Sequence, residues 1–159
     1  MHYRGKFIHA LKEDCLFIRC HVHFSFTFIN NVNCEKRYAM DLNPKTQELL
    51  DENVIFYRRD CSKPWNIEPK SVDLVFTSNF FEHLPNKNSL EQTVIEIKKA
   101  LKPNGMLIAV GPNISILKGE YWDFWDHHVA LSESSLCELL EIHNFTITRS
   151  HAKFLPYNM

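Results

Sequence analysis

The sequence predicts a doubly wound α/β domain built on a mostly parallel sheet. Two largely apolar runs, at 72–76 and 106–110, are typical of strands that are buried on both faces of such a sheet. Around these runs, strand patterns alternate with helical patterns at short loop lengths. The 159 residues, 45% of them hydrophobic, suit a single domain (1–159) that is large enough to bury a core.

Charge and cysteine content argue against several classes of protein. The formal net charge of -1 gives no electrostatic basis for binding nucleic acid or an acidic membrane surface. No stretch approaches the ~18 consecutive apolar residues of a membrane span, and the charged first residues do not suit a secretory signal. The five cysteines are odd in number and scattered, so no disulfide framework is expected, and a reducing cytoplasm is the expected location.

The first half of the chain is expected to hold three strands. These are predicted at 15–18, 36–42 and 54–57. Residues 22–28 alternate apolar and polar side chains as a strand does, although a βα order would place a helix there. Asn43 followed by Pro44 predicts a helix start, because Asn is a good N-cap and Pro suits the first helical position.

The second half is expected to hold three strands and two helices. Between the strands at 72–76 and 106–110, Ser89 and Gln92 form a capping box that starts a helix, which ends at 103–105. Ser132 caps the last helix, and residues 145–148 alternate as a strand. The final residues, KFLPYNM, could add a short strand. The sequence stops soon after Phe154, so this strand, and the fold at both ends, could be incomplete.

Polar residues follow three of the predicted strands at what should be one edge of the sheet. Asp41 ends one strand, Asp60 follows the next, and Ser78 and Asn79 close the strand at 72–76. Open α/β sheets bind ligands at the carboxyl ends of their strands, where an acid such as Asp41 accepts hydrogen bonds from ribose hydroxyls. Asp60 could accept from an exocyclic amine. A helix-dipole role for Asp41 and a solvated loop position for Asp60 remain open.

These residues and two longer passages carry a family resemblance. Asp41 after RYAM, Asp60 after VIFYRR, the passage DLVFTSNFFEHLP and the passage IKKALKPNGMLIAV resemble class I S-adenosylmethionine-dependent methyltransferases of the type 11 group. The resemblance spans residues 38–154. It implies a Rossmann-like, seven-stranded sheet with S-adenosylmethionine lying across the carboxyl ends of strands one, two and four.

The resemblance also implies a role for each site residue. Asp41 would hold the ribose hydroxyls and Leu42 would pack on the adenine. Asp60 and Cys61 would meet the adenine edge. Ser78 and Asn79 would flank the methionine portion, and 82–84 would serve packing and loop shape.

The chain departs from the family where a glycine-rich loop is expected. That loop lies ~20 residues before the acid of the second strand, and counting back from Asp41 gives Cys20-His21-Val22-His23-Phe24. No glycine occurs between Gly5 and Gly105, and other residues cannot turn as tightly beside a cofactor. We therefore expect family-like sequence only from about residue 29, with 1–28 altered by a frameshift, a wrong start or exon, or decay of the locus.

Histidines in the segment YWDFWDHHVAL are the candidates for proton transfer. His127 or His128 could act as a general base toward the methyl acceptor, since histidine titrates near neutral pH. Methyl transfer can also proceed by alignment alone. The neighbouring aromatics, Tyr121, Trp122, Phe124 and Trp125, could wall an apolar or sugar substrate or pack the loop.

The spacing of Cys15, Cys20, His21 and His23 does not match the usual zinc patterns, and no metal is expected there. The sequence therefore predicts methyl transfer from S-adenosylmethionine to a small molecule. Two alternatives remain, a degenerate domain that acts only by binding a partner, and a nicotinamide-dependent oxidoreductase. The second of these also needs the missing glycine loop.

Overall fold

The computed structural model describes residues 14–18, 26–117 and 119–153. The expected glycine-loop position, residues 20–24, lies outside these ranges, as do the last residues of KFLPYNM. In chain order the elements are β1 Cys15–Ile18, α1 Phe26–Asn31, β2 Arg37–Asp41, η1 Pro44–Leu49, β3 Val54–Arg58, β4 Val72–Ser78, η2 Phe81–His83, α2 Lys87–Ala100, β5 Leu101–Val110, α3 Ile114–Leu117, η3 Glu120–Asp123 and α4 Glu133–Ile142.

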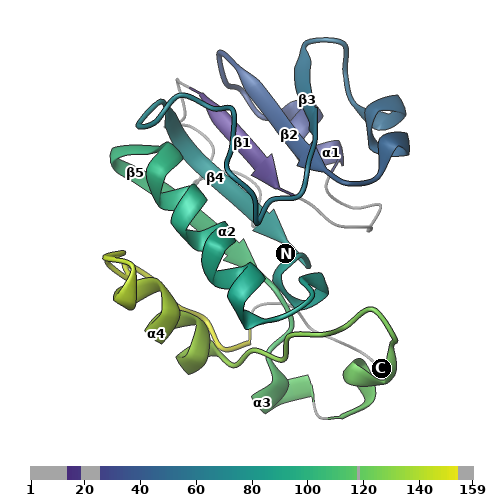
Figure 1. The fold of residues 1–159 in the computed structure, drawn as a ribbon, viewed down its shortest axis with the longest axis vertical. Coiled ribbons are helices and arrows are strands. Elements are labelled where there is room, and N and C mark those ends of the chain that lie inside the picture. The colour runs from purple at the N-terminus through teal and green to yellow at the C-terminus, as the bar shows by residue number, and fades with distance from the viewer. Residues whose placement is uncertain (1–13, 19–25, 118, 154–159) are drawn as a thin grey trace, which may run out of the picture.

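The described strands form one five-stranded sheet in the order β3-β2-β1-β4-β5. Every pairing is parallel, and β1 pairs with β2 on one side and with β4 on the other. Figure 1 shows β1 at the centre of the sheet, with α2 and α4 in front of it. The predicted doubly wound α/β fold is confirmed, and residues ahead of 28 supply its central strand.

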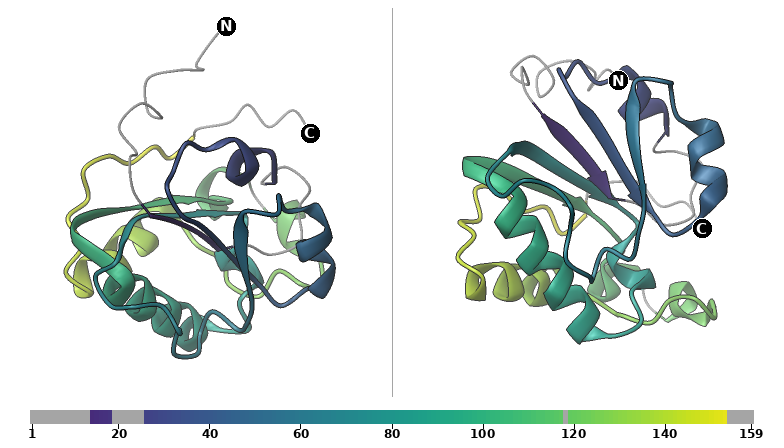
Figure 2. Two further views of the ribbon diagram at one scale, coloured as in Figure 1. Left: turned by 90° about the horizontal axis from the view of Figure 1, so that it is seen from above. Right: turned by 45° about the horizontal axis from the view of Figure 1, so that its top comes forward.

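Helices cover both faces of the sheet, as Figure 2 shows with α1 on one side and α2 and α4 on the other. The main core cluster lies under α2 and α4, and its most buried members are Met40, Val72, Val75, Leu90, Val94 and Ile97. The second cluster lies under α1 and consists of Cys15, Ile29, Val32, Ala39, Val54 and Leu74. Alternate residues of the buried strands thus supply both cores, which explains their nearly continuous apolar sequence.

Helix starts follow the expected chemistry with one exception. The side chain of Asn43 accepts from the Lys45 N–H, and Ser132 forms a capping box with Ser135. The expected box at Ser89 is wrong. The Asn86 side chain accepts from the Ser89 N–H, so α2 begins three residues earlier, at Lys87.

The end of α2 also differs from the prediction. The helix ends at Ala100, and Leu101 already pairs with Val72 as the first residue of β5. Asn104 has a positive φ of 66°, and a Cβ on Gly105 would stand 3.0–3.1 Å from two backbone carbonyl oxygens. The Pro-Asn-Gly turn therefore lies inside β5 as an irregularity in its ladder, rather than between the helix and the strand.

Two segments of alternating pattern are not strands in the structure. Residues 26–31 form α1, and Ile29 of this helix and Val32 just after it are buried in the second core cluster. Residues 145–148 carry no strand pairing, although Phe145 and Ile147 pack against the main core cluster. At 145–148 the alternation therefore reflects packing of every second side chain on the core, and does not require a neighbouring strand.

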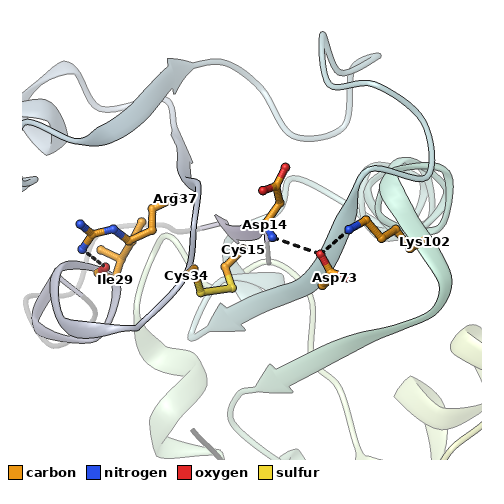
Figure 3. The surroundings of a disulfide bond; sticks show 7 residues. All are labelled: Asp14, Cys15, Ile29, Cys34, Arg37, Asp73 and Lys102. Carbon is orange, nitrogen blue, oxygen red and sulfur yellow. Dashed lines mark hydrogen bonds and ion pairs between the residues drawn. A yellow bond between two sulfur atoms is a disulfide. The ribbon is translucent and has the colours of Figure 1, made fainter. Parts of the chain in front are cut away.

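One disulfide joins Cys15 to Cys34, which the scattered cysteines of the sequence did not predict (Figure 3). Parallel pairing of β1 with β2 places Cys15 opposite Arg37, three residues after Cys34. The Cα atoms of Cys15 and Cys34 are 6.2 Å apart, within the range for a disulfide. Because Cys15 is in the disulfide, it does not serve as a metal ligand. The other three residues of the set considered for metal binding, Cys20, His21 and His23, lie outside the described residues. Among the described helices, none is both long enough and apolar enough to cross a membrane.

The amino-terminal edge of the sheet is tied by one carboxylate, also drawn in Figure 3. Asp73 Oδ2 accepts from the Asp14 N–H at 3.1 Å and from Lys102 Nζ at 2.8 Å. This arrangement links β1, β4 and β5 at the edge opposite the expected ligand site. At the carboxyl end of α1, Arg37 Nη1 donates to the carbonyls of Ile29 and Asn30. Carbonyls in the last turn of a helix have no N–H partner within the helix, so Arg37 supplies the donor from outside it.

Breaking the disulfide should destabilise the fold. Cys34→Ser should lower the free energy of unfolding by about 3 kcal/mol, because a closed loop of this size restricts the unfolded chain. Urea denaturation of the oxidised proteins would measure the change. Cys137→Ser, which alters a cysteine outside the disulfide, is the control. Equal stability of oxidised and fully reduced wild type would contradict this expectation.

Truncating the main core should cost more than truncating the surface. Ile97→Ala should lose roughly 2–5 kcal/mol, since Ile97 lies on the face of α2 that packs on the core and is fully buried. Ile142→Ala, at a position that is 64% exposed, should change stability by less than about 1 kcal/mol. Similar denaturation midpoints for the two variants would show that α2 is not packed as described.

Candidate functional site

The register of the sheet brings the predicted site residues to one edge. Met40 pairs with Ile18, and Ile18 pairs with Thr77. Asp41 of β2 and Ser78 of β4, the next residues of the two strands that flank β1, therefore lie at the same level of the carboxyl edge. Neighbouring strands are about 4.8 Å apart, so these two positions, separated by β1, are roughly 10 Å apart.

Asp41 is buried and anchors the start of η1. Its Oδ1 accepts from the Asn43 N–H at 2.9 Å, and its Oδ2 accepts from Thr46 Oγ1 at 2.7 Å. Asp41 therefore has the local structural role at a helix start that the sequence left open. A carboxylate offers about four acceptor positions, so two remain for ribose hydroxyls. Leu42, next in the chain, is 64% exposed at this edge and is open to a flat ligand.

Asp60 and Cys61 follow β3. Asp60 Oδ1 accepts from both the backbone N–H and the hydroxyl of Ser62, at 2.8 and 2.7 Å. The Cys61 side chain is buried in the main core cluster, and its carbonyl accepts from Trp65 Nε1 at 2.9 Å. Cys61 thus fixes the loop after β3 by packing in the core and by this hydrogen bond. Of the two residues, Asp60 is the one whose side chain could accept a hydrogen bond from a ligand.

Asn79 is the most informative residue at this edge. Its backbone is left-handed, with φ 46°, and its N–H donates to the Val110 carbonyl at 2.9 Å. Its side-chain Oδ1 is buried, and no described residue donates to it; the same holds for Thr77 Oγ1. Buried acceptors are normally satisfied, so an orphaned pair at a strand tip indicates a place for a bound group or water.

Glu82 also lies at the site, although the sequence predicted only a role in packing and loop shape for it. It is 1% exposed, and Tyr121 donates its hydroxyl to Oε1 at 3.3 Å. Burial raises the pKa of the Glu82 carboxyl above its ordinary value. No described group donates to Oε2. The only sequence signal was an acid just after a buried strand.

The segment after β5 is held against Glu82 by its backbone. The N–H groups of His128 and Val129 both donate to the Glu82 carbonyl, at 2.8 and 3.0 Å. His127 Nδ1 lies 2.7 Å from the Tyr121 carbonyl, and its ring stacks on the Tyr121 ring. The structure therefore brings His127 to the carboxyl edge.

His128 lies differently, with an exposed side chain. A general-base role for either histidine remains a prediction. Of the four aromatics in this segment, Tyr121 and Trp122 are half-buried, whereas Phe124 and Trp125 are exposed. Only Tyr121 and Trp122 can wall a site from within.

Comparison with known proteins agrees with this architecture. The methyltransferase-domain family model matches residues 22–109, more than half of the chain. A protein of Arabidopsis thaliana named "Probable methyltransferase PMT22" is 33% identical over 70 residues, which is 44% of this chain and 11% of that protein.

Solved structures share the fold at low identity. An S-adenosylmethionine-dependent methyltransferase from Archaeoglobus fulgidus superposes with a TM-score of 0.69 at 17% identity, covering 88% of this chain and 63% of that one. The N-methyltransferase NodS of Bradyrhizobium japonicum, in complex with S-adenosyl-L-homocysteine, gives 0.66 at 16% identity over 83% and 65%. This chain thus spans less than two thirds of each of these relatives. By its match to the family model, the chain belongs to the methyltransferase-domain family.

Proposed function

We propose that this chain binds S-adenosylmethionine at the carboxyl edge of its sheet and transfers the methyl group to a small-molecule acceptor. Family membership supports the reaction class. The NodS relative is described in complex with the demethylated cofactor, which supports the choice of cofactor. The formal net charge of -1 favours a small acceptor over nucleic acid.

The single observation that carries the proposal is the orphaned Oδ1 of Asn79. A buried amide oxygen at the tip of β4 suits a ligand that brings its own donor, such as the ammonium group of the cofactor's methionine portion. The residues on the neighbouring strands fit the rest of the molecule. Asp41 has acceptor positions left for ribose hydroxyls, and Leu42 offers an exposed apolar surface for adenine.

The chain's own part in the reaction is to bind, orient and exclude water. When bound, the cofactor supplies a methyl group on a positively charged sulfur. Because such a methyl group is already activated, most of the catalytic effect can come from holding the acceptor in line with it. Tyr121, which contacts Glu82, and Trp122, whose ring packs on that of Tyr121, would wall the acceptor side. His127 or His128 would take a proton where the acceptor carries one.

Leu42→Ala should weaken cofactor binding without weakening the fold. Loss of an apolar contact to adenine should cost roughly 1–2 kcal/mol, or about tenfold in Kd. Leu49→Ala is the matched control, because Leu49 is also an exposed leucine, at the far end of η1. Isothermal titration calorimetry with S-adenosyl-L-homocysteine gives both values. Equal loss in the two variants would remove Leu42 from the site.

Asn79→Gly should also weaken binding, since it removes the orphaned oxygen but keeps the left-handed backbone accessible. The expected loss is about tenfold or more in Kd for the same ligand. Asn104→Gly is the control, because Asn104 has a similar positive φ inside β5 and lies near its amino-terminal end. Asn79→Gly should unfold at the same urea concentration as wild type.

The same titration decides between enzyme and binding module. If wild type gives no heat of binding at millimolar cofactor, the chain is a degenerate domain of this fold, and the methyl-transfer proposal is wrong.

A further inference from the structure

We propose that His83, Asp126 and His127 bind a divalent transition-metal cation of the zinc type. The three residues come from two segments that are 43 positions apart in the chain, the end of η2 and the loop after η3. One ligand atom from each residue lies within 4.8 Å of the other two. Two imidazoles and one carboxylate are a donor set that binds Zn²⁺ with positions left open.

The imidazoles are held in the way that metal-binding histidines are held. His127 Nδ1 is 2.7 Å from the Tyr121 carbonyl, and His83 Nδ1 is 3.1 Å from the Asp126 carbonyl. A carbonyl oxygen only accepts, so each Nδ1 donates its proton there, and Nε2 is the ring nitrogen that can face a metal. Donation from the second ring nitrogen to a backbone carbonyl is the usual support of a histidine ligand.

The backbone around the cluster is fixed by contacts that do not involve the ligand atoms. The Glu82 carbonyl accepts from the N–H groups of His128 and Val129, which ties the residues beside His83 to those beside His127. The ring of Tyr121 stacks on that of His127, with centroids 4.5 Å apart. The two histidine rings meet edge to face at 4.8 Å. Two of the three ligands are therefore positioned before any metal arrives.

Asp126 supplies the adjustable ligand. Its Oδ2 is 3.2 Å from His83 Nδ1, and its side chain is 57% exposed, whereas that of His83 is 8% exposed. Bond lengths near 2.1 Å in a tetrahedral zinc site place ligand atoms roughly 3.4 Å apart. Ligand atoms that lie within 4.8 Å of one another need to approach by at most about 1.4 Å, and the exposed Asp126 carboxylate is free to turn toward the ion. The same exposure gives the ion a path from solvent.

A buried acid, Glu82, lies next to the cluster and contacts both of its segments. Glu82 precedes His83 in the chain, is 1% exposed, and has an Oε2 to which no described group donates. Its other oxygen accepts from Tyr121, the residue whose carbonyl holds His127. Mg²⁺ and Ca²⁺ prefer all-oxygen sites, so the two imidazoles select a transition metal instead.

Metal binding is tested directly and without cofactor, so the result is independent of the proposed methyl transfer. The full-length chain is stripped with a chelator and titrated with Zn²⁺ against a chromophoric competitor. Wild type should bind one ion per chain. His83→Ala and His127→Ala should each weaken binding by at least tenfold. His128→Ala is the matched control, because His128 is adjacent but outside the cluster, and it should bind as wild type does.

Asp126→Asn provides a variant at an exposed position in case a histidine variant does not fold. It should also weaken Zn²⁺ binding, and circular dichroism should show an unchanged fold. Bound Zn²⁺ should raise the melting temperature of wild type and of His128→Ala, but not that of the cluster variants. Failure of wild type to bind Zn²⁺, or equal binding by wild type, His127→Ala and Asp126→Asn, would overturn the proposal.

Discussion

The parallel pairing of β1 with both β2 and β4 is the constraint on which the rest of the structure depends. A strand of four residues joins two strand pairs that otherwise share no hydrogen bonds in the described sheet. Its register sets Asp41 and Ser78 at the same level, and so creates the edge that can receive a ligand. The Asp73 carboxylate secures the opposite end by bonding groups next to β1 and at β5.

Much of the fold could be predicted because parallel strands buried on both faces have nearly continuous apolar sequences. The strands β2 to β5 were expected within a few residues, and the caps at Asn43 and Ser132 follow from side-chain chemistry that acts over three or four positions. Predictions were wrong where a period of two was read as a strand. At 145–148 the alternation is real burial, but no described strand lies beside it to complete a ladder.

The candidate site divides in the same way. Asp41, Asp60, Ser78 and Asn79 could be named because each follows a strand, and strand ends are legible in the sequence. Two contacts could not be predicted, that of Glu82 with Tyr121 and that of His83 with Asp126. Each spans about 40 positions and depends on how the loops after β4 and β5 pack. The Cys15–Cys34 bridge was hidden for the same reason, since only the sheet register brings those cysteines together.

The topology of the sheet has a consequence for how the chain folds. Asp14 and Asp73, at the starts of β1 and β4, touch across 59 positions, whereas Cys15 of β1 and Arg37 of β2 pair across a much shorter stretch of sequence. Parallel contacts between distant segments slow folding, because the entropy of closing the loop must be overcome before the pairing contributes. One side of β1 must therefore stay open until β4 has been synthesised. During that interval a nascent chain exposes an unpaired strand, and a chaperone or fast collapse of the neighbouring helices would limit its association with other chains.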